Sequence, residues 1–251
     1  MAAHLLYPLL TLLAVFTGFI DSVAGGGGLI MVPALLYAGI PPAMLLGTNK
    51  IQSACGTAIA AWRYHRLGLY RLAPNAGAVA AVFAGAAAGA FAISRLSGHV
   101  LGLVVPVLLM AVALYTLVSP RMTDEDSHQR LGDGGWLGLA GSIGAYDGFF
   151  GPGTGQFFAT ALVSLRGLGL TRATGLTKLF NLTSNLAAIA VFASGAHILW
   201  GLGLCMAAGA MAGNWLGAHT AHRHGARLIR PLLVTMSLGL TAKLVWSWFA
   251  G

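Results

Sequence analysis

Two aspartates and two lysines stand inside long apolar stretches of this sequence. Asp21 and Asp147 precede glycine-rich segments, and Lys50 and Lys178 follow on the next apolar runs. A charged side chain inside a bilayer is costly and marks a candidate functional site. Lysines near glycine-rich breaks could hold an anion, because the free N–H groups of a helix that starts at such a break also carry partial positive charge.

Polar residues recur at helical spacing after each lysine. Lys50 is followed by polar residues at i+3 and i+7, and Lys178 is followed by polar residues at the same spacing, so each trio falls on one helix face. A lone lysine would snorkel to the nearer interface, whereas a repeated polar stripe is typical of a cavity wall. The trios are Lys50, Ser53 and Thr57, and Lys178, Asn181 and Asn185.

The glycine segments 25–28 and 151–155 suit a chain reversal inside the membrane. Irregular backbone at that depth is tolerated only where it is buried in protein or lines a cavity, and glycine lets a ligand approach the backbone closely. Short helices that start near Leu29 and Gln156 would direct N–H groups to the membrane interior. Tight helix packing is the alternative role of glycine. We expect that role for "AGAAAGA" (84–90), but it does not explain an aspartate before both segments.

These patterns define the candidate site. The predicted substrate-binding residues are Lys50, Lys178, Asn49, Ser53, Thr57, Thr177, Asn181, Asn185, Gly25, Gly26, Gly27, Gly153, Thr154 and Gln156. Asp21 and Asp147 are predicted to have a structural or coupling role, either fixing the lysines or bending the turns. The other four acids lie in the polar segment 119–135 and are expected to be solvated: Asp124, Glu125, Asp126 and Asp133.

The composition indicates a membrane protein. Of 251 residues, 57% are hydrophobic and 8% are charged, against about a quarter charged in soluble domains. The net charge of +8 comes mainly from basic residues in short connections between apolar runs, which is the pattern of topology signals, so we exclude nucleic-acid binding. We predict no cofactor and no metal: Cys55 and Cys205 lack metal-ligand spacing, and the histidine-rich segment 219–227 is better explained as a basic loop.

The two halves of the chain are related in sequence. "GFIDSVAGGGG" (18–28) aligns with "GAYDGFFGPGTG" (144–155), and a second pair of blocks aligns around the two lysines. We interpret the chain as a tandem duplication that forms one domain. Its parts are a first membrane repeat at 1–118, a cytoplasmic polar linker at 119–135 and a second membrane repeat at 136–251.

The distribution of arginine distinguishes parallel from inverted repeats. The apolar runs at about 4–20, 28–40, 136–150 and 155–165 are short and come in glycine-joined pairs. If each pair is a hairpin, one membrane face holds every arginine except Arg95; if each pair is one broken span, the arginines divide almost evenly. We therefore predict an all-α polytopic membrane protein with two inverted-topology repeats, each a Gly-broken re-entrant helical hairpin followed by three transmembrane helices.

The blocks "GFIDSVAGGGGLIMVPALLYAGIPPAMLLGTNK" and the second-half counterpart ending "GLTK" resemble the sulfite exporter TauE/SafE family of membrane permeases. The resemblance covers nearly the whole chain. It implies transport of sulfite, thiosulfate, sulfoacetate or other small sulfur-containing or organic anions across the bacterial cytoplasmic membrane. Pro152 and Thr154 interrupt the second glycine run. The binding residues that the two halves contribute are therefore not equivalent.

We therefore expect a secondary transporter of a small anion, most closely sulfite or a related oxidised sulfur or organosulfonate anion, that works by alternating access between the repeats. It is expected to be a multi-pass inner-membrane protein and not an enzyme, with the anion and the lipid bilayer as its partners. An anion channel and association as a homodimer stay open as alternatives. An intramembrane aspartyl protease is a weaker alternative, because Asp21 follows "GFI" and not the glycine-containing sequence of that class.

Overall fold

The structure is a computed structural model that describes residues 3–118, 124–195 and 197–224. These residues form nine α-helices and one short 3-10 helix, with no strand among them. The elements are α1 Ala3–Ala24, α2 Gly27–Tyr37, α3 Pro42–Arg66, η1 Ala73–Asn75, α4 Ala76–Ser94, α5 Gly98–Val118, α6 Asp133–Phe149, α7 Thr154–Arg166, α8 Leu170–Ser194 and α9 Trp200–His224. The all-helical prediction is confirmed. The part of the predicted second repeat from residue 225 onward, which includes the end of the predicted loop at 219–227, lies outside the described residues.

Three of the described helical segments are long and apolar enough to cross a membrane: Leu5–Ala24, Ala73–Ser94 and Leu170–Ser194. With 11 residues in α2 and 13 in α7, these two helices are too short to cross a bilayer core of about 30 Å. The first apolar run was predicted to be short, at about 4–20. Helix α1 is longer, because it continues through Asp21 to Ala24, and its segment Leu5–Ala24 is long enough to span.

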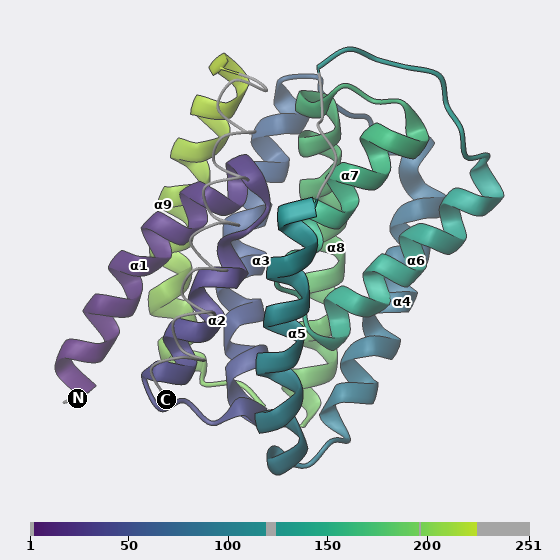
Figure 1. The fold of residues 1–251 in the computed structure, drawn as a ribbon. Helices are drawn as coiled ribbons and strands as arrows, with labels where there is room; N and C mark the ends of the chain where they lie inside the picture. Colours follow the sequence, from purple (N-terminus) through teal and green to yellow (C-terminus); the bar gives the residue numbers. More distant parts are fainter. Residues whose placement is uncertain (1–2, 119–123, 196, 225–251) are drawn as a thin grey trace.

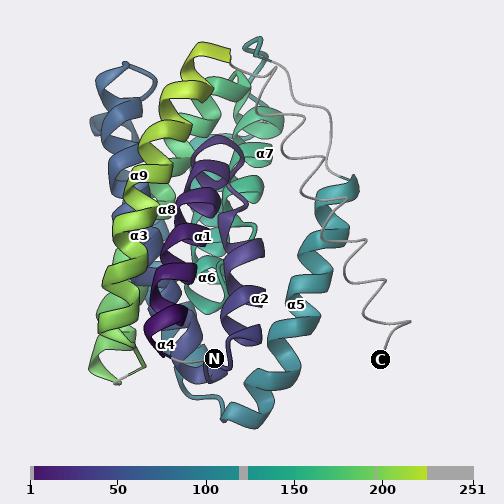
Figure 2. The ribbon, with the colours of Figure 1, turned by 90° about the vertical axis from the view of Figure 1, so that its left-hand side faces the viewer.

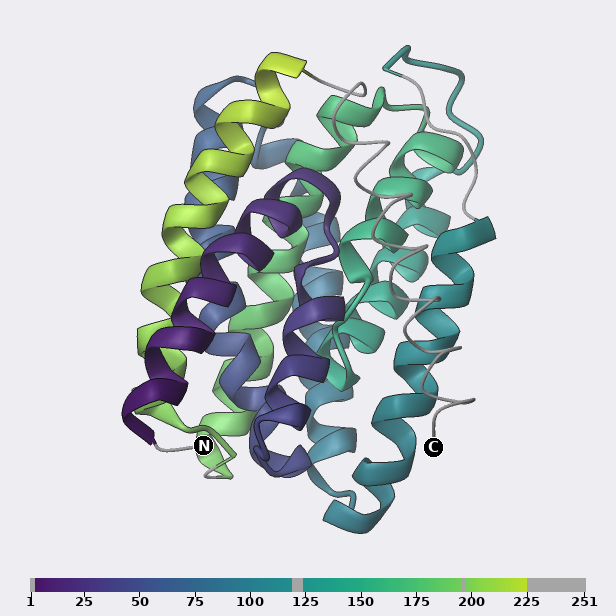
Figure 3. The same cartoon turned by 60° about the vertical axis from the view of Figure 1, so that its left-hand side comes forward.

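The helices form a bundle in which two hairpins turn back inside the molecule (Figure 1). In that view α1 rises from the lower end and α2 returns to it, whereas α6 descends from the upper end and α7 returns upward. The longer helices α3, α4, α8 and α9 run along the bundle, as Figure 3 shows from another side. Helix α5 lies at the edge of the bundle (Figure 2).

Close packing between helices depends on glycine at matching positions of the two halves. Helix α1 packs against α9, and α6 packs against α4. A Cβ atom at Gly18 would lie 2.7 Å from the carbonyl oxygen of Ala210, and one at Gly144 would lie 2.6 Å from that of Val82. Both distances are too short for a methyl group, so glycine is what lets these helices approach. Gly85 and Gly89, in the predicted packing segment 84–90, also face the backbone of α6.

We expect Gly144→Ala to destabilise the protein by about 1–3 kcal/mol, because the added methyl group would overlap the backbone of α4. Gly138→Ala on the same helix is the matched control, since no atom lies within 4 Å of a Cβ at that position. Alanine is favoured over glycine in a helix by about 1 kcal/mol, so the control should be neutral or stabilising. Thermal unfolding in detergent measures both. Equal midpoints for the two variants would contradict this account of the packing.

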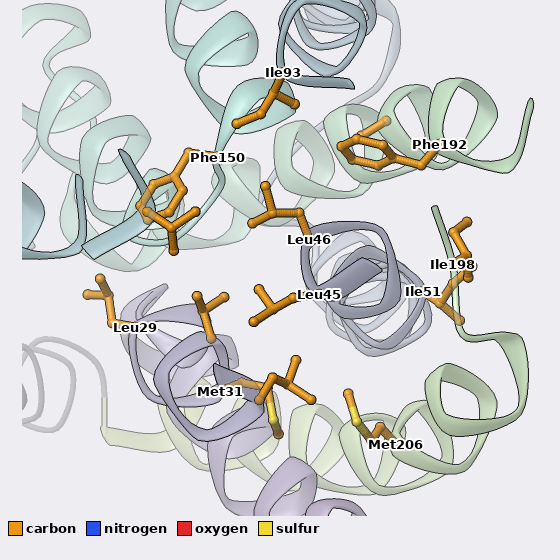
Figure 4. Packing of buried hydrophobic residues seen from close by; sticks show 14 of the residues in the cluster. Leu29, Met31, Leu45, Leu46, Ile51, Ile93, Phe150, Phe192, Ile198 and Met206 are labelled. Atoms are coloured by element: carbon orange, nitrogen blue, oxygen red, sulfur yellow. The ribbon is translucent and has the colours of Figure 1, made fainter. Parts of the chain in front are cut away.

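Buried apolar side chains form two separate clusters, one toward each end of the bundle. The lower cluster includes Leu29, Met31, Leu45, Leu46, Ile93, Phe150, Phe192, Ile198 and Met206. The upper cluster includes Tyr64, Val82, Trp136, Phe158, Leu162, Leu170, Leu176 and Phe180. Figure 4 shows Leu45 and Leu46 of α3 pointing into the lower cluster, between Phe150 and Met31. The polar middles of α3 and α8 lie between the two clusters along these helices.

Candidate functional site

The two hairpins turn at glycines whose backbone conformation other residues adopt only with strain. Gly25, between α1 and α2, has φ 73°, and Gly151 and Gly153, between α6 and α7, have φ 102° and 85°. Positive φ is accessible to glycine at no steric cost. These glycines therefore explain why each helix stops one turn after its aspartate and why the chain can reverse within the bundle.

The two turns touch each other through their backbones. A Cβ atom at Gly25 would lie 2.7 Å from the Cα of Gly155, and one at Gly155 would lie 2.5 Å from the Cα of Gly25. Any side chain at either position would push the turns apart. The glycine segments of the two halves, which are about 130 residues apart in the chain, thus meet at one place inside the protein.

Lys50 of α3 forms a buried ion pair with Asp147 at the end of α6. The Lys50 Nζ donates to Oδ1 of Asp147 at 2.5 Å and to its main-chain oxygen at 2.7 Å. Both side chains are 5% exposed or less. The ammonium therefore neutralises the carboxylate and also a carbonyl at the negative end of the α6 dipole. Ser184 of α8 donates from its hydroxyl to the other carboxylate oxygen.

Lys178 of α8 repeats this arrangement at the end of α1. Its Nζ donates to the main-chain oxygen of Asp21 and lies 3.1 Å from Oδ2 of the same residue. The side chain of Lys178 is completely buried, whereas that of Asp21 is 21% exposed. Each lysine therefore pairs with the aspartate of the other half of the chain. The structural or coupling role expected of the two aspartates stays a prediction.

The described ion pairs do not use every N–H donor of the two lysines. An ammonium group has three N–H donors, and the described contacts of Lys50 and of Lys178 use two. The four charges sum to zero, so a further anion would meet no net repulsion from the cluster. Gly151 makes room for one of these contacts, since a Cβ there would lie 3.0 Å from the Lys50 Nζ.

A cavity of about 30 Å³ lies between the turns and the polar faces of α3 and α8. This volume holds about two water molecules. The predicted site residues that line it are Asn49, Lys50, Ser53, Thr57, Asn181, Asn185, Gly25, Gly153, Thr154, Asp21 and Asp147. Both polar stripes, both aspartates and both glycine turns therefore reach one cavity.

Five predicted substrate-binding residues do not line this cavity: Lys178, Thr177, Gly26, Gly27 and Gln156. Lys178 is instead held against Asp21. Thr177, the residue before Lys178, is buried. Gln156, in the first turn of α7, is also buried. Gly27 packs against α1, where a Cβ would lie 2.5 Å from the Thr17 carbonyl oxygen.

Four lining residues were absent from the predicted set: Gly28, Gly151, Pro152 and Gly155. They extend the two glycine segments and could have been included on that ground. Ser184 was also missed. Its counterpart in the first half is Gly56, so the repeat contains no signal for it, although it lies one turn after Asn181.

Polar groups without a described partner lie at the cavity. The amides of Gly28 and Gly155 donate to no carbonyl among the described backbone contacts, as expected at helix N-termini. Two acceptors, Oδ1 of Asn49 and Oδ1 of Asn181, are buried without a hydrogen bond in the described part of the chain. Thr57 differs, because its hydroxyl donates to the Ser53 carbonyl at 2.7 Å. The free amides carry partial positive charge, which favours an anion.

A family model described as "Sulfite exporter TauE/SafE" matches residues 10–244. The chain belongs to the sulfite exporter TauE/SafE family. It is therefore a membrane protein of a transporter family, as the composition and the long apolar helices also indicate. The family match spans both aspartates, both lysines and both glycine turns.

Curated proteins named as probable membrane transporters align along nearly the whole chain. A "Probable membrane transporter protein ORF9" from Sinorhizobium sp. is 43% identical over 98% of this chain and 94% of its own length. A "Probable membrane transporter protein" from Haemophilus influenzae is 44% identical over 92% of both chains. "Probable membrane transporter protein YfcA" from Escherichia coli K12 is 39% identical over 98% of this chain and 92% of its own length. No solved structure matches.

Proposed function

We propose that this protein is a secondary transporter of a small anion, most closely sulfite or a related oxidised sulfur or organosulfonate anion. The observation that carries the proposal is the cavity between the two glycine turns, which polar residues of both halves line. A transporter needs a desolvated site that each side of the membrane can reach in turn. The family description supplies the sulfur anion as the first substrate to test.

Inverted repeats are part of this proposal, with the repeats at 1–118 and 136–251 and the cytoplasmic linker at 119–135. The directions of the helices support them: α3 rises and α8 descends in Figure 1, and the two hairpins open to opposite ends. In the two repeats α1 would correspond to α6 and α4 to α9. The contact of α1 with α9 then has its counterpart in the contact of α6 with α4. The upper end of the bundle would face the cytoplasm, with the protein in the inner membrane, because Arg63, Arg71 and Arg166 lie in the segments that meet there.

The anion would bind between the turns and contact Lys50 directly. The third N–H of Lys50 would donate to an anion oxygen, together with the free amides at the starts of α2 and α7. The side-chain amides of Asn49 and Asn181 would contribute further donors once rotated. Asp147 and Asp21 would hold the lysines in place, which distinguishes this site from an aspartic protease, where two carboxylates share one proton.

Alternating access would open the cavity by separating one apolar cluster at a time. In the described conformation the cavity has room for about two water molecules, and buried apolar side chains fill the bundle toward both ends. Toward the upper end the barrier includes Phe158 and Phe180, whose ring centroids lie 5.1 Å apart.

Flux measurements in proteoliposomes test the proposed function. We expect saturable sulfite uptake that thiosulfate or sulfoacetate inhibits by competition and that trans-loaded sulfite accelerates by exchange. Empty liposomes control for leak. Flux that rises linearly with sulfite concentration and shows no exchange would support a channel. No flux for any of the anions would contradict the assignment.

A further inference from the structure

A cationic cavity lies at the upper end of the bundle, apart from the central cavity. Its volume is about 530 Å³, and its lining residues include Arg71, Arg166 and Arg172. These arginines come from the connection after α3, the end of α7 and the start of α8. Trp136 and Leu176 contribute an apolar part of the wall. None of these residues takes part in the proposed anion site.

The cavity has one arginine whose charge is not compensated by a described ion pair. Arg166 pairs with Asp133 at 2.8 Å and Arg172 pairs with Asp126 at 2.5 Å. Exposed pairs of this kind contribute little free energy, and the side chains of Asp133, Arg172 and Asp126 are more than half exposed. An incoming anion can therefore replace the aspartate carboxylate as the partner of Arg166 or Arg172. Arg71 is exposed and has no ion-pair partner among the described residues.

An apolar groove of about 520 Å³ adjoins the cationic cavity. It is lined by Leu72, Ala76, Val79, Phe83 and Leu179, among others. The two sites meet where Arg71 is followed by Leu72, and on α8, where Leu176 of the cavity lies one turn before Leu179 of the groove. Phe83 is 47% exposed and Leu72 is 52% exposed, so the groove is open at the surface of the bundle.

We propose that these two adjoining sites bind one anionic phospholipid, with its phosphate in the cationic cavity and an acyl chain in the groove. The planar guanidinium groups match phosphate oxygens in pairs. Basic pockets between membrane helices at the cytoplasmic side are suited to anionic headgroups. A free anion would explain the arginines but not the groove, whereas a neutral lipid would explain the groove but not the arginines. The proposal requires only that the chain is a membrane protein and does not depend on the transported substrate.

Native mass spectrometry of the purified full chain tests this site. The protein is titrated with dioleoyl phosphatidylglycerol and with dioleoyl phosphatidylcholine, which share acyl chains and differ in net charge. We expect tighter binding of phosphatidylglycerol and a loss of about fivefold in its affinity in Arg71→Gln, which corresponds to one surface charge. Arg95→Gln is the control, because Arg95 is an exposed arginine at the other end of α4 and should bind the lipid as the wild type does. Phe83→Ala should weaken the binding of both lipids.

Three results would overturn the proposal. Equal binding of the two lipids by the wild-type protein would mean that the arginines recognise no headgroup. Equal binding of phosphatidylglycerol by the wild type and by Arg71→Gln would place the lipid elsewhere. Displacement of phosphatidylglycerol by glycerol 3-phosphate at equal concentration would show that the cavity binds a soluble anion and that the groove contributes nothing. Failure of sulfite transport with the expected lipid binding intact would leave this proposal standing and reject only the proposed function.

Discussion

Replacing Lys50 by methionine should lower stability by about 3–5 kcal/mol and abolish sulfite flux. The reason for the first effect is that Asp147, whose side chain is 5% exposed, would remain as a buried charge without its ion-pair partner. The reason for the second is that the anion would lose the third N–H of Lys50, and a hydrogen bond to a charged group is worth about tenfold or more in affinity. Thermal unfolding in detergent and flux in proteoliposomes measure the two effects separately.

The double variant Lys50→Met with Asp147→Asn separates folding from transport. Neutral residues at both positions remove the unpaired charge, and replacing a buried ion pair by neutral side chains is often tolerated. We expect stability close to that of the wild type and flux that stays absent. Restored flux in the double variant would show that Lys50 acts only by balancing Asp147, which would reject its role as an anion ligand. The equivalent double variant, Lys178→Met with Asp21→Asn, tests the second pair.

Gly155→Ala should also abolish transport, because the methyl group would overlap the Gly25 backbone and separate the two turns. The Cβ would lie 2.5 Å from the Cα of Gly25, and neither backbone can rotate away as a flexible side chain would. Overpacking of this kind costs about 1–3 kcal/mol. Gly155 is not among the glycines with positive φ, so the variant tests the contact between the turns and not the backbone conformation.

Gly28→Ala is the matched control for the contact between the turns. Gly28 lines the same cavity, but the nearest atom to its Cβ would be the Cα of Pro152 at 3.4 Å, which is an ordinary contact. We expect the unfolding midpoint of Gly28→Ala to equal that of the wild type or to exceed it, because alanine is the better helix former. Similar destabilisation by the two variants would mean that the cavity lining as a whole tolerates no methyl group, and the specific contact between the turns would lose its support.

The sequence allowed prediction of the residues around the central cavity but not of their partners. The repeat relation and helical spacing identified Lys50, Lys178 and the polar stripes, and eleven of the sixteen predicted site residues line one cavity. The exchange of partners, in which each lysine pairs with the aspartate of the other half, depends on how α3 and α8 pack against the hairpins. Nothing in the local sequence of one half indicates it.

The acids of the polar linker have a contact that the sequence pattern did not indicate. They were expected to be solvated, and Asp124 and Asp126 are exposed. In addition, Asp126 accepts a hydrogen bond from the Gly169 amide at 2.7 Å, and Asp124 accepts one from the Thr171 amide at 2.7 Å. Both carboxylates thus cap the start of α8, where free N–H groups favour negative charge. The sequence did not indicate this second role because the helix end that they cap lies more than 40 residues away in the chain.

Direct binding of sulfite to the purified protein is the measurement that tests the central claim most directly. Isothermal titration of sulfite should give one saturable site per chain in the wild type, with sulfoacetate as a competitor. In Asn181→Leu, which keeps both ion pairs but removes an amide from the cavity wall, the affinity should fall by about tenfold. Sulfite binding of unchanged affinity in Asn181→Leu and in the Lys50→Met with Asp147→Asn variant would contradict an anion site between the two glycine turns.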